Sequence, residues 1–355
     1  KIRLGFLSSD IIQGHSITYF LKTILSNYDK DKFEIILLLN NPKEDQLTES
    51  FKYLVDKTIN ISKMNNIDAV NQVRKLKLDI VIDLMGYTSK QRLELFKNRM
   101  AKNQIIWMGY CNTTGLKSMD YIISDPNLIR SGEEKYYSEK VIHLPKIWNS
   151  HCGYDFKREE TAPPFIKNRY FTFGSFNNFD KINPNVVSTW SKILKKINNS
   201  QLVLKTSSKR LATKRLKELF QKDGVLESVK FLDRAEKFKD HLDSYNLIDI
   251  ALDTFPYNGV TTSFEAVWMG VPVITMAGYN FNSRCGESIN KNLNMEQLIA
   301  KDEDDYVQKV VNLTNNTDDY INIRNSIFID AIKSPLFNTK DYSKSFFKAL
   351  EEIVK

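Results

Sequence analysis

One stretch, residues 252–270, places a glycine-containing turn, two threonines and a carboxylate in an order that suits a phosphate-bearing ligand. A buried strand ends at its start, the turn ends at Gly259, and an apolar-periodic run then predicts a helix that begins near Thr261 and Thr262. The start of a helix favours an anion, and Glu265 one turn later is able to accept hydrogen bonds from a ribose diol. The same residues also fit an ordinary helix cap. Support for a phosphate site must therefore come from elsewhere in the chain.

Other polar candidates lie near the ends of predicted elements. His15 follows the first strand in a loop with Asp10, which is able to orient a histidine for proton transfer but is also a common turn residue. Lys181 stands just before a predicted helix, where a lysine is a plausible diphosphate contact but more often a solvated charge. His241 lies in the predicted helix that precedes the strand leading to residue 252. A lone histidine is more often structural than catalytic, and His15 stands out because its loop should face a ligand.

Strands and amphipathic helices alternate in both halves of the chain, and this order predicts an α/β fold with parallel, doubly wound sheets. Predicted strands in the first half cover residues 2–7, 33–39, 79–84, 105–108, 121–123 and 140–144. Those in the second half cover 171–176, 201–205, 229–232, 248–252 and 273–276, with helices at 185–196, 209–221 and 237–247. We expect a ligand in the cleft between two such domains.

The chain is predicted to contain two domains and two connecting segments. Residues 1–150 form an N-terminal Rossmann-like domain, and the polar residues 151–169, with two adjacent prolines, form a linker. Residues 170–333 form a C-terminal Rossmann-like domain, and the helical segment 334–355 packs back on the first domain. Because the chain starts directly in a strand, we expect further residues upstream in the natural protein.

The composition is that of a globular protein, since 42% of the 355 residues are hydrophobic and 12% are aromatic. The formal charge is +8, but the lysines are scattered and form no dense basic run, so we expect no nucleic-acid partner. Three cysteines at wide spacing indicate neither a disulfide framework nor a zinc site. No apolar run reaches the ~18 residues of a membrane span, and we expect a cytoplasmic protein without a membrane partner.

Six short blocks, taken in order, resemble the protein O-glycosyltransferases of glycosyltransferase family 41, which include the O-GlcNAc transferases and the plant SPINDLY proteins. The blocks are residues 5–10 with 15–20; 107–115 with 120–121; 174–178 with 181; 241 with 249 and 252–254; 261–262 with 265 and 269–272; and 334–339. The resemblance covers the whole chain as a catalytic region, and the family's tetratricopeptide repeats would lie upstream.

The resemblance implies a GT-B fold, with two Rossmann-like domains whose parallel sheets face across a cleft. It also implies an inverting transfer of a sugar to Ser or Thr hydroxyls that requires no metal or other cofactor. In family terms Lys181 would contact the diphosphate and stabilise the leaving nucleotide, and Thr261 and Thr262 would bind the phosphates. His241 would lie by the base or ribose, and Glu265 would hold the ribose.

The remaining implied site residues concern the nucleotide and the sugar. Asn178 would lie beside the nucleotide, and His15 would act as a general base or position the sugar. The sugar pocket would be lined by Thr88, Met108, Gly109 and Cys111.

Departures from the family pattern leave the donor open. Cys111 stands where O-GlcNAc transferases have proline, Asp180 where the animal enzymes have tyrosine, and Val260 where they have histidine. Residues 253–257 are closer to SPINDLY, whereas residues 334–340 are closer to O-GlcNAc transferases. UDP-GlcNAc is the favoured donor and GDP-fucose the alternative, and the acceptor is a protein or peptide.

Three other functions compete with this interpretation. A GT-B sugar-nucleotide epimerase needs acid and base carboxylates near the sugar, which the six blocks do not clearly supply. A catalytically inactive nucleotide-sugar-binding scaffold is a further alternative, and the retained Lys181 and His15 argue against it. Nucleic-acid binding rests only on the net charge and would show a steep salt dependence.

Overall fold

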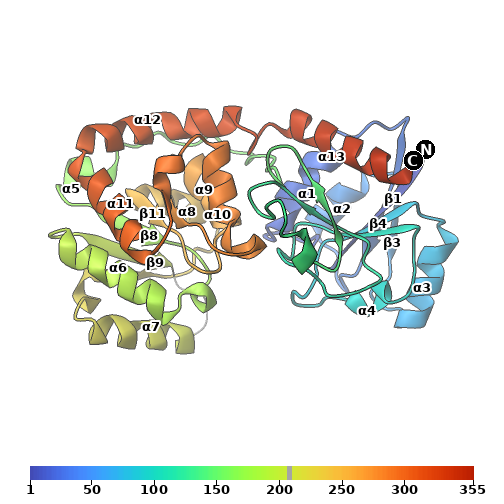
Figure 1. The fold of residues 1–355 in the computed structure, drawn as a ribbon, viewed down its shortest axis with the longest axis horizontal. Helices are drawn as coiled ribbons and strands as arrows, with labels where there is room; N and C mark the ends of the chain where they lie inside the picture. Colours follow the sequence, from blue (N-terminus) through green and yellow to red (C-terminus); the bar gives the residue numbers. More distant parts are fainter. Residues whose placement is uncertain (206–209) are drawn as a thin grey trace. The chain divides into compact units, whose positions relative to one another are not determined.

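The computed structural model describes residues 1–205 and 210–355, so the predicted helix start at Lys209 lies outside the described residues. The chain divides into two compact units (Figure 1). The first unit contains residues 1–153 together with 337–355, and the second contains residues 154–336. Each unit has its own parallel sheet.

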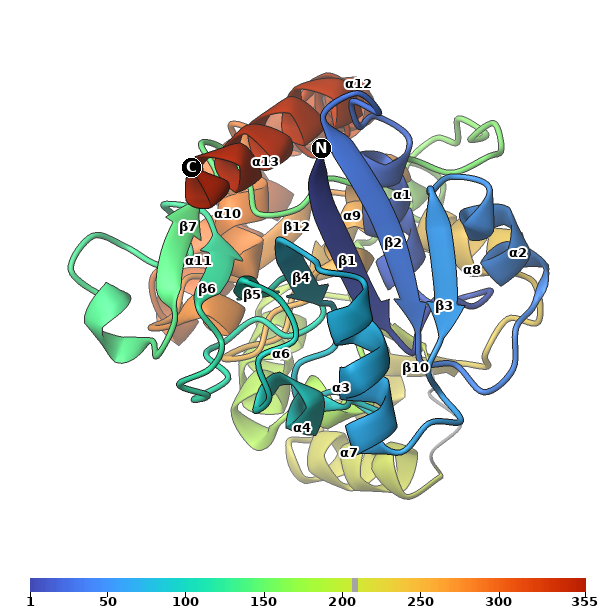
Figure 2. The ribbon, with the colours of Figure 1, turned by 90° about the vertical axis from the view of Figure 1, so that its right-hand side faces the viewer.

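The sheet of the first unit has the strand order β3-β2-β1-β4-β5-β6-β7, and all neighbours pair in parallel (Figure 2). The strands are β1 Ile2–Ser8, β2 Phe33–Leu39, β3 Lys57–Asn60, β4 Ile80–Asp83, β5 Asn103–Ile106, β6 Tyr121–Ser124 and β7 Lys140–His143. The central strands are buried on both faces, which explains why their sequences are almost unbroken apolar runs. Edge strand β3 was not predicted because it is short and only half-buried at its centre.

The first unit also contains the last helix of the chain. Its helices are α1 Ile17–Leu25, α2 Gln46–Lys52, α3 Asn66–Lys75, α4 Leu93–Phe96 and α13 Thr339–Val354. In α13 the Tyr342 hydroxyl donates to the carbonyl of Trp148 at 2.7 Å, and the Phe346 ring lies 4.7 Å from that of Trp107. The C-terminal segment therefore supplies part of the core of the first unit.

The sheet of the second unit has the strand order β10-β9-β8-β11-β12-β13, again with parallel neighbours. Its strands are β8 Thr172–Ser175, β9 Gln201–Lys205, β10 Val229–Leu232, β11 Ile250–Leu252, β12 Val273–Met276 and β13 Ile299–Ala300. Its helices are α5 Pro164–Asn168, α6 Pro184–Lys196, α7 Arg210–Lys222, α8 Phe238–Asp243, α9 Thr261–Trp268, α10 Cys285–Asn292, α11 Glu303–Asn315 and α12 Thr317–Lys333. Among the helices of residues 1–205 and 210–355, none is long and apolar enough to cross a bilayer.

The segment predicted as a linker, residues 151–169, is divided between the units, and most of it packs on the second. The ring of Phe165 stacks on that of Phe171 at 4.2 Å, and the Phe165 N–H donates to the carboxylate of Asp249 at 2.9 Å. Helix α5 also forms inside this segment. The sequence did not reveal these contacts, because aromatic residues scattered through a polar segment leave no periodic pattern.

The strand order reverses beside the first strand of each sheet. Strand β1 lies between β2 and β4, and β8 lies between β9 and β11. In open parallel sheets ligands bind beyond the carboxyl ends of the strands at this point of reversal. The loops that follow β1 and β4, and those that follow β8 and β11, are therefore the places to look for chemistry.

We expect Phe346→Ala to destabilise the first unit by about 3–5 kcal/mol, because it removes a fully buried ring that packs against Trp107. Equilibrium urea unfolding followed by tryptophan fluorescence measures the change. Lys348→Ala, at an exposed position of the same helix, is the matched control and should change stability by less than about 0.5 kcal/mol. Equal effects of the two substitutions would contradict a structural role for α13 in this unit.

Candidate functional site

The loop between β11 and α9 is shaped by close approaches around Gly259. Its backbone N–H donates to the Asp253 carboxylate at 2.7 Å. A Cβ atom at this position would lie 2.5 Å from the Thr262 hydroxyl oxygen, so a larger residue would push the loop away from the helix. The Thr262 hydroxyl in turn donates to the side-chain oxygen of Asn177 at 3.0 Å. Glycine is thus required here by packing, as the turn pattern in the sequence indicated.

Asp253 is the buried anchor of this loop. Its carboxylate accepts hydrogen bonds from the N–H groups of Thr254 at 2.9 Å and Gly259 at 2.7 Å, and from the Thr275 hydroxyl at 2.7 Å. Burial raises the pKa of Asp253 to about 6, although these donors act in the opposite direction. Asp253 is not among the residues predicted from the sequence to belong to the site. The sequence feature that points to Asp253 is its position as an acidic residue directly after the buried strand β11.

The start of α9 presents unpaired donors. Across the part of the chain that the structure describes, the backbone N–H groups of Thr261 and Thr262 have no hydrogen-bond partner. The ammonium group of Lys181 donates to the carbonyl of Asn258, three residues before the helix, at 2.8 Å and lies 4.0 Å from the centre of the Tyr257 ring. A helix N-terminus with a lysine beside its loop is a favourable place for a phosphate group.

Four side chains form a polar network beside α9. The ammonium group of Lys205 lies 2.8 Å from Nδ1 of His241, and Nε2 of His241 lies 3.0 Å from Oε2 of Glu265. The Tyr245 hydroxyl donates to the same carboxylate oxygen at 2.9 Å. His241 and Glu265, which lie 24 positions apart in the sequence, are thus in direct contact.

The network fixes the hydrogen atoms of His241. An ammonium group has no lone pair, so Lys205 donates to Nδ1, and the remaining ring hydrogen lies on Nε2 and points at Glu265. Oε2 of Glu265 then accepts from both His241 and Tyr245, and among the described residues Oε1 has no hydrogen-bond partner. This free oxygen is able to accept from a ligand hydroxyl, and the ribose-binding role of Glu265 stays a prediction.

Lys205 and Tyr245 are members of the network that sequence analysis missed. Burial lowers the pKa of Lys205, with the neighbouring Glu265 and Asp240 acting in the opposite direction. Lys205 is the last residue of β9, so a search of all carboxyl ends of parallel strands would have found it. Tyr245 carries no such signal, because a tyrosine in an apolar-periodic run is usually part of the core.

Asn178 is the least supported prediction in the second unit. It is exposed, and its side-chain oxygen caps the short 3₁₀ helix Phe179–Lys181 by accepting from the Asp180 N–H at 3.1 Å. This contact gives Asn178 a local role in orienting the turn that carries Lys181. Its contact with a nucleotide stays a prediction.

In the first unit, His15 lies in the loop between β1 and α1. Its side chain is 41% exposed, and Nε2 lies 3.8 Å from the Asp10 carboxylate, too far for a hydrogen bond. The His15 backbone carbonyl accepts from the Thr18 hydroxyl at 2.7 Å. The ring is therefore accessible to a ligand.

The residues predicted to line a sugar pocket follow β4 and β5, which are neighbours in the sheet. Met108 has a φ of 75°, unusual for a residue with a side chain, and a Cβ on Gly109 would lie 1.8 Å from the Leu84 carbonyl oxygen. Cys111 is buried, and its thiol lies 3.7 Å from the Met108 carbonyl. The Thr88 hydroxyl oxygen is buried without a hydrogen-bond partner among the described residues. Most buried hydroxyls in proteins have a hydrogen-bond partner, so the Thr88 hydroxyl is a candidate for a ligand contact.

The predicted residues of the first unit lie in loops after the neighbouring strands β1, β4 and β5, and those of the second unit lie around the start of α9 and in the loop after β8. The first-unit set consists of His15, Thr88, Met108, Gly109 and Cys111. The second-unit set consists of Asn178, Lys181, His241, Thr261, Thr262 and Glu265.

The chain has relatives over its whole length. A tomato (Solanum lycopersicum) protein named as a probable UDP-N-acetylglucosamine–peptide N-acetylglucosaminyltransferase SPINDLY is 32% identical over 353 residues. A barley (Hordeum vulgare) protein of the same name is 33% identical over 353 residues. The alignments cover 96% and 98% of this chain and 37% of each relative, so the chain spans little more than a third of the length of these curated relatives.

The fold is also that of solved glycosyltransferases. A mutant of the Thermobaculum terrenum O-GlcNAc transferase matches all of this chain and 68% of its own chain, with a TM-score of 0.93 and 27% sequence identity. Together with the two Rossmann-like units, this likeness identifies the fold as GT-B. The model of the family described as glycosyl transferase family 41 matches residues 1–152 and 166–346. Since this match takes in most of both units, the chain belongs to glycosyl transferase family 41.

Proposed function

We propose that this chain transfers a sugar from a nucleotide donor to Ser or Thr hydroxyls of proteins, with UDP-GlcNAc as the donor. The observation that carries the proposal is the second-unit cluster, in which unpaired N–H groups at the start of α9 lie next to a loop held by Lys181. The neighbouring carboxylate of Glu265 has one oxygen free for a ribose hydroxyl. Relatives named as UDP-N-acetylglucosamine transferases support the choice of donor.

In the proposed reaction the acceptor hydroxyl oxygen forms a bond to the anomeric carbon while the bond from that carbon to the diphosphate oxygen breaks. The nucleotide leaves with the electron pair, and the hydroxyl proton passes to a base. Lys181 and the N–H groups of Thr261 and Thr262 stabilise the charge that develops on the departing diphosphate. Attack from the face opposite to the leaving group inverts the configuration of the sugar.

The first-unit cluster serves the sugar and the acceptor in this proposal. His15 has an accessible ring with the Asp10 carboxylate 3.8 Å away, and in this proposal it acts as the base or positions the sugar. The Thr88 hydroxyl, which is buried and has no hydrogen-bond partner among the described residues, is assigned to a sugar hydroxyl in this proposal. Met108, Gly109 and Cys111 supply the wall of the pocket, since their backbone conformation is fixed by close packing.

Calorimetric titration with UDP, UDP-GlcNAc, GDP and GDP-fucose tests the donor. We expect the uridine pair to bind at least about tenfold more tightly than the guanosine pair, a difference of about 1.4 kcal/mol. Preference for the guanosine pair would assign the chain to fucosyl transfer. Binding of none of the four by folded protein would contradict the proposed function and favour a scaffold.

Replacing Lys181 by alanine should lower kcat for sugar transfer by about 10²- to 10³-fold, because it removes a cation that stabilises the leaving nucleotide. The nucleotide dissociation constant should change less than kcat. Lys192→Ala is the matched control, since Lys192 lies on α6 with its side chain 48% exposed. Unchanged transfer by Lys181→Ala would refute the role of Lys181 in the chemical step.

The Lys205→Met substitution keeps a flexible aliphatic side chain of similar length but removes the ammonium group that donates to His241. We expect nucleotide affinity to fall about tenfold, because His241 is then free to change its tautomer and its contact with Glu265 weakens. Calorimetry with the preferred nucleotide measures the loss. In the control, Lys217→Met, the removed ammonium group lies over the Phe231 ring at 5.3 Å, and affinity should not change. Equal affinities for the two variants would contradict a role of Lys205 at the nucleotide.

A further inference from the structure

The position of His15 depends on the backbone of its loop. Among the described residues its ring has only two polar contacts, both long: Nδ1 accepts from the Ile17 N–H at 3.5 Å, and Nε2 lies 3.8 Å from the Asp10 carboxylate. The loop is exposed at Gln13 and at Gly14, whose φ is 80°. A loop of this kind holds a side chain at a fixed point only if other residues bind its backbone.

Two residues of helix α2 and its cap bind that backbone. The Gln13 N–H donates to Oδ2 of Asp45 at 2.7 Å, across 32 positions of sequence. The Ile11 carbonyl accepts from the Thr48 hydroxyl at 2.7 Å, and the side chain of Asn41 donates to it at 3.4 Å. The loop is therefore bound on both sides of residue 12, within a few residues of His15.

Asp45 divides its two carboxylate oxygens between two tasks. Oδ1 caps helix α2 by accepting from the Thr48 N–H at 2.9 Å, while Oδ2 accepts from Gln13. The Asp45 N–H donates back to the Thr48 hydroxyl at 3.2 Å, which completes a capping box. Burial would raise the pKa of Asp45, but the N–H groups of Gln13 and Thr48 outweigh it and hold the pKa below its usual value. Asp45 is thus a carboxylate acceptor fixed at a helix start.

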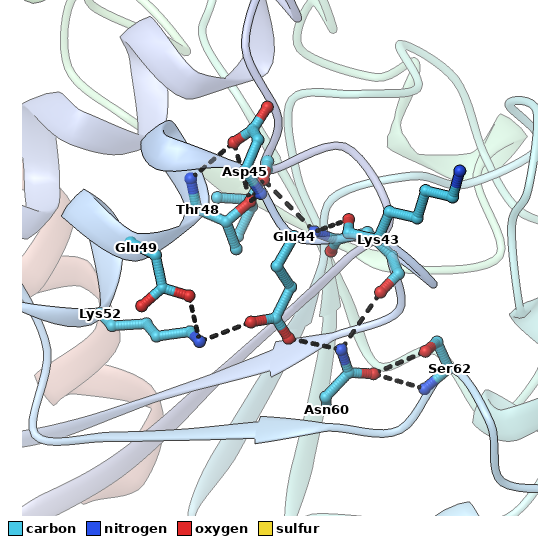
Figure 3. A network of polar contacts seen from close by, with 10 residues as sticks. Lys43, Glu44, Asp45, Thr48, Glu49, Lys52, Asn60 and Ser62 are labelled. Atoms are coloured by element: carbon cyan, nitrogen blue, oxygen red, sulfur yellow. Dashed lines mark hydrogen bonds and ion pairs between the residues drawn. The ribbon is translucent and has the colours of Figure 1, made fainter.

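A second set of contacts holds this helix start in place (Figure 3). The carboxylate of Glu44 pairs with Lys52 in α2 and accepts from the side chain of Asn60, at the end of β3, at 2.6 Å. Asn60 also donates to the carbonyl of Asn41 at 3.1 Å. The segment that carries Asp45 is therefore joined to both α2 and β3, and it cannot easily follow a movement of the His15 loop.

We propose that Asp45 is a positioning residue that holds the loop of His15 through the Gln13 N–H and so fixes the place of the histidine. The effect on transfer rests on the function proposed above, whereas the effect on the loop does not.

Asp45→Ser separates the two tasks of the carboxylate. Serine caps helices about as well as aspartate, so α2 keeps its cap, but a single short hydroxyl cannot also reach Gln13. The matched control is Asp302→Ser, because Asp302 caps α11 by accepting from the Asp305 N–H at 2.8 Å and binds no catalytic loop. If Asp45→Ser unfolds, Asp45→Asn replaces it, since an amide oxygen can replace only one of the two carboxylate oxygens.

Hydrogen exchange measures the loop directly. The Gln13 amide should exchange about tenfold faster in Asp45→Ser, as expected when one hydrogen bond is lost, while the amides of α2 stay protected. Asp302→Ser should leave the exchange of residues 11–15 unchanged. Unchanged exchange of the Gln13 amide in Asp45→Ser would overturn the proposal, whatever the activity of the protein.

Sugar transfer then tests whether the loop acts through His15. We expect Asp45→Ser to lower kcat about tenfold with little change in nucleotide affinity, and to have no further effect when His15→Ala is already present. If His15→Ala lowers kcat but Asp45→Ser keeps the full kcat of the wild-type enzyme, the proposal is also overturned. Wild-type protein that transfers no sugar would refute the proposed function, and the exchange experiment would still decide whether Asp45 holds the loop.

Discussion

The candidate site depends on two buried carboxylates that end equivalent strands of the two sheets. Asp83 closes β4 and accepts from the N–H groups of Met85 and Gly86, and Asp253 follows β11 and accepts from the loop before α9. Burial raises the pKa of Asp83 to about 7 and that of Asp253 to about 6, so each charged form is costly unless the loop donates to it. A carboxylate that needs backbone donors forces the following loop into one conformation. Both loops leave the sheet where the strand order reverses, which is where a ligand binds in such folds.

The loops around these carboxylates are packed so closely that residue size is restricted. Glycine is required at positions 86, 109 and 259 because a side chain there would collide with Tyr110, the Leu84 carbonyl or Thr262. Met108 keeps an unusual backbone conformation between such contacts. Strain of this kind persists only where the surroundings fix the chain. Packing against the sheets and helices thus holds in one conformation loops that would otherwise be mobile.

The two clusters reach their order by different means. In the second unit, a network runs from Lys205 through His241 to Glu265, so each side chain fixes the hydrogen-bonding state of the next. In the first unit the His15 ring has only long polar contacts among the described residues, and Asp45 binds the backbone of its loop at Gln13. A ligand-binding group gains from a fixed pattern of donors and acceptors, whereas a group that exchanges protons gains from an accessible ring on a fixed loop. The family of the chain accords with both arrangements, and the proposed division of labour follows from them.

The sequence by itself determined the parallel sheets, the helix after Gly259 and which polar residues follow which strand, because apolar periodicity and turn residues are local signals. It also identified the family, because the six blocks lie in order along the chain. Only the tertiary structure decided that Lys205 contacts His241 and that Asp45 binds Gln13. These pairs are 36 and 32 positions apart, and the sequence around one partner gives no indication of the other. It also decided that most of the polar segment 151–169 packs on the second unit. Contacts between distant residues depend on how strands are ordered in a sheet, and a single sequence carries no local pattern for that order.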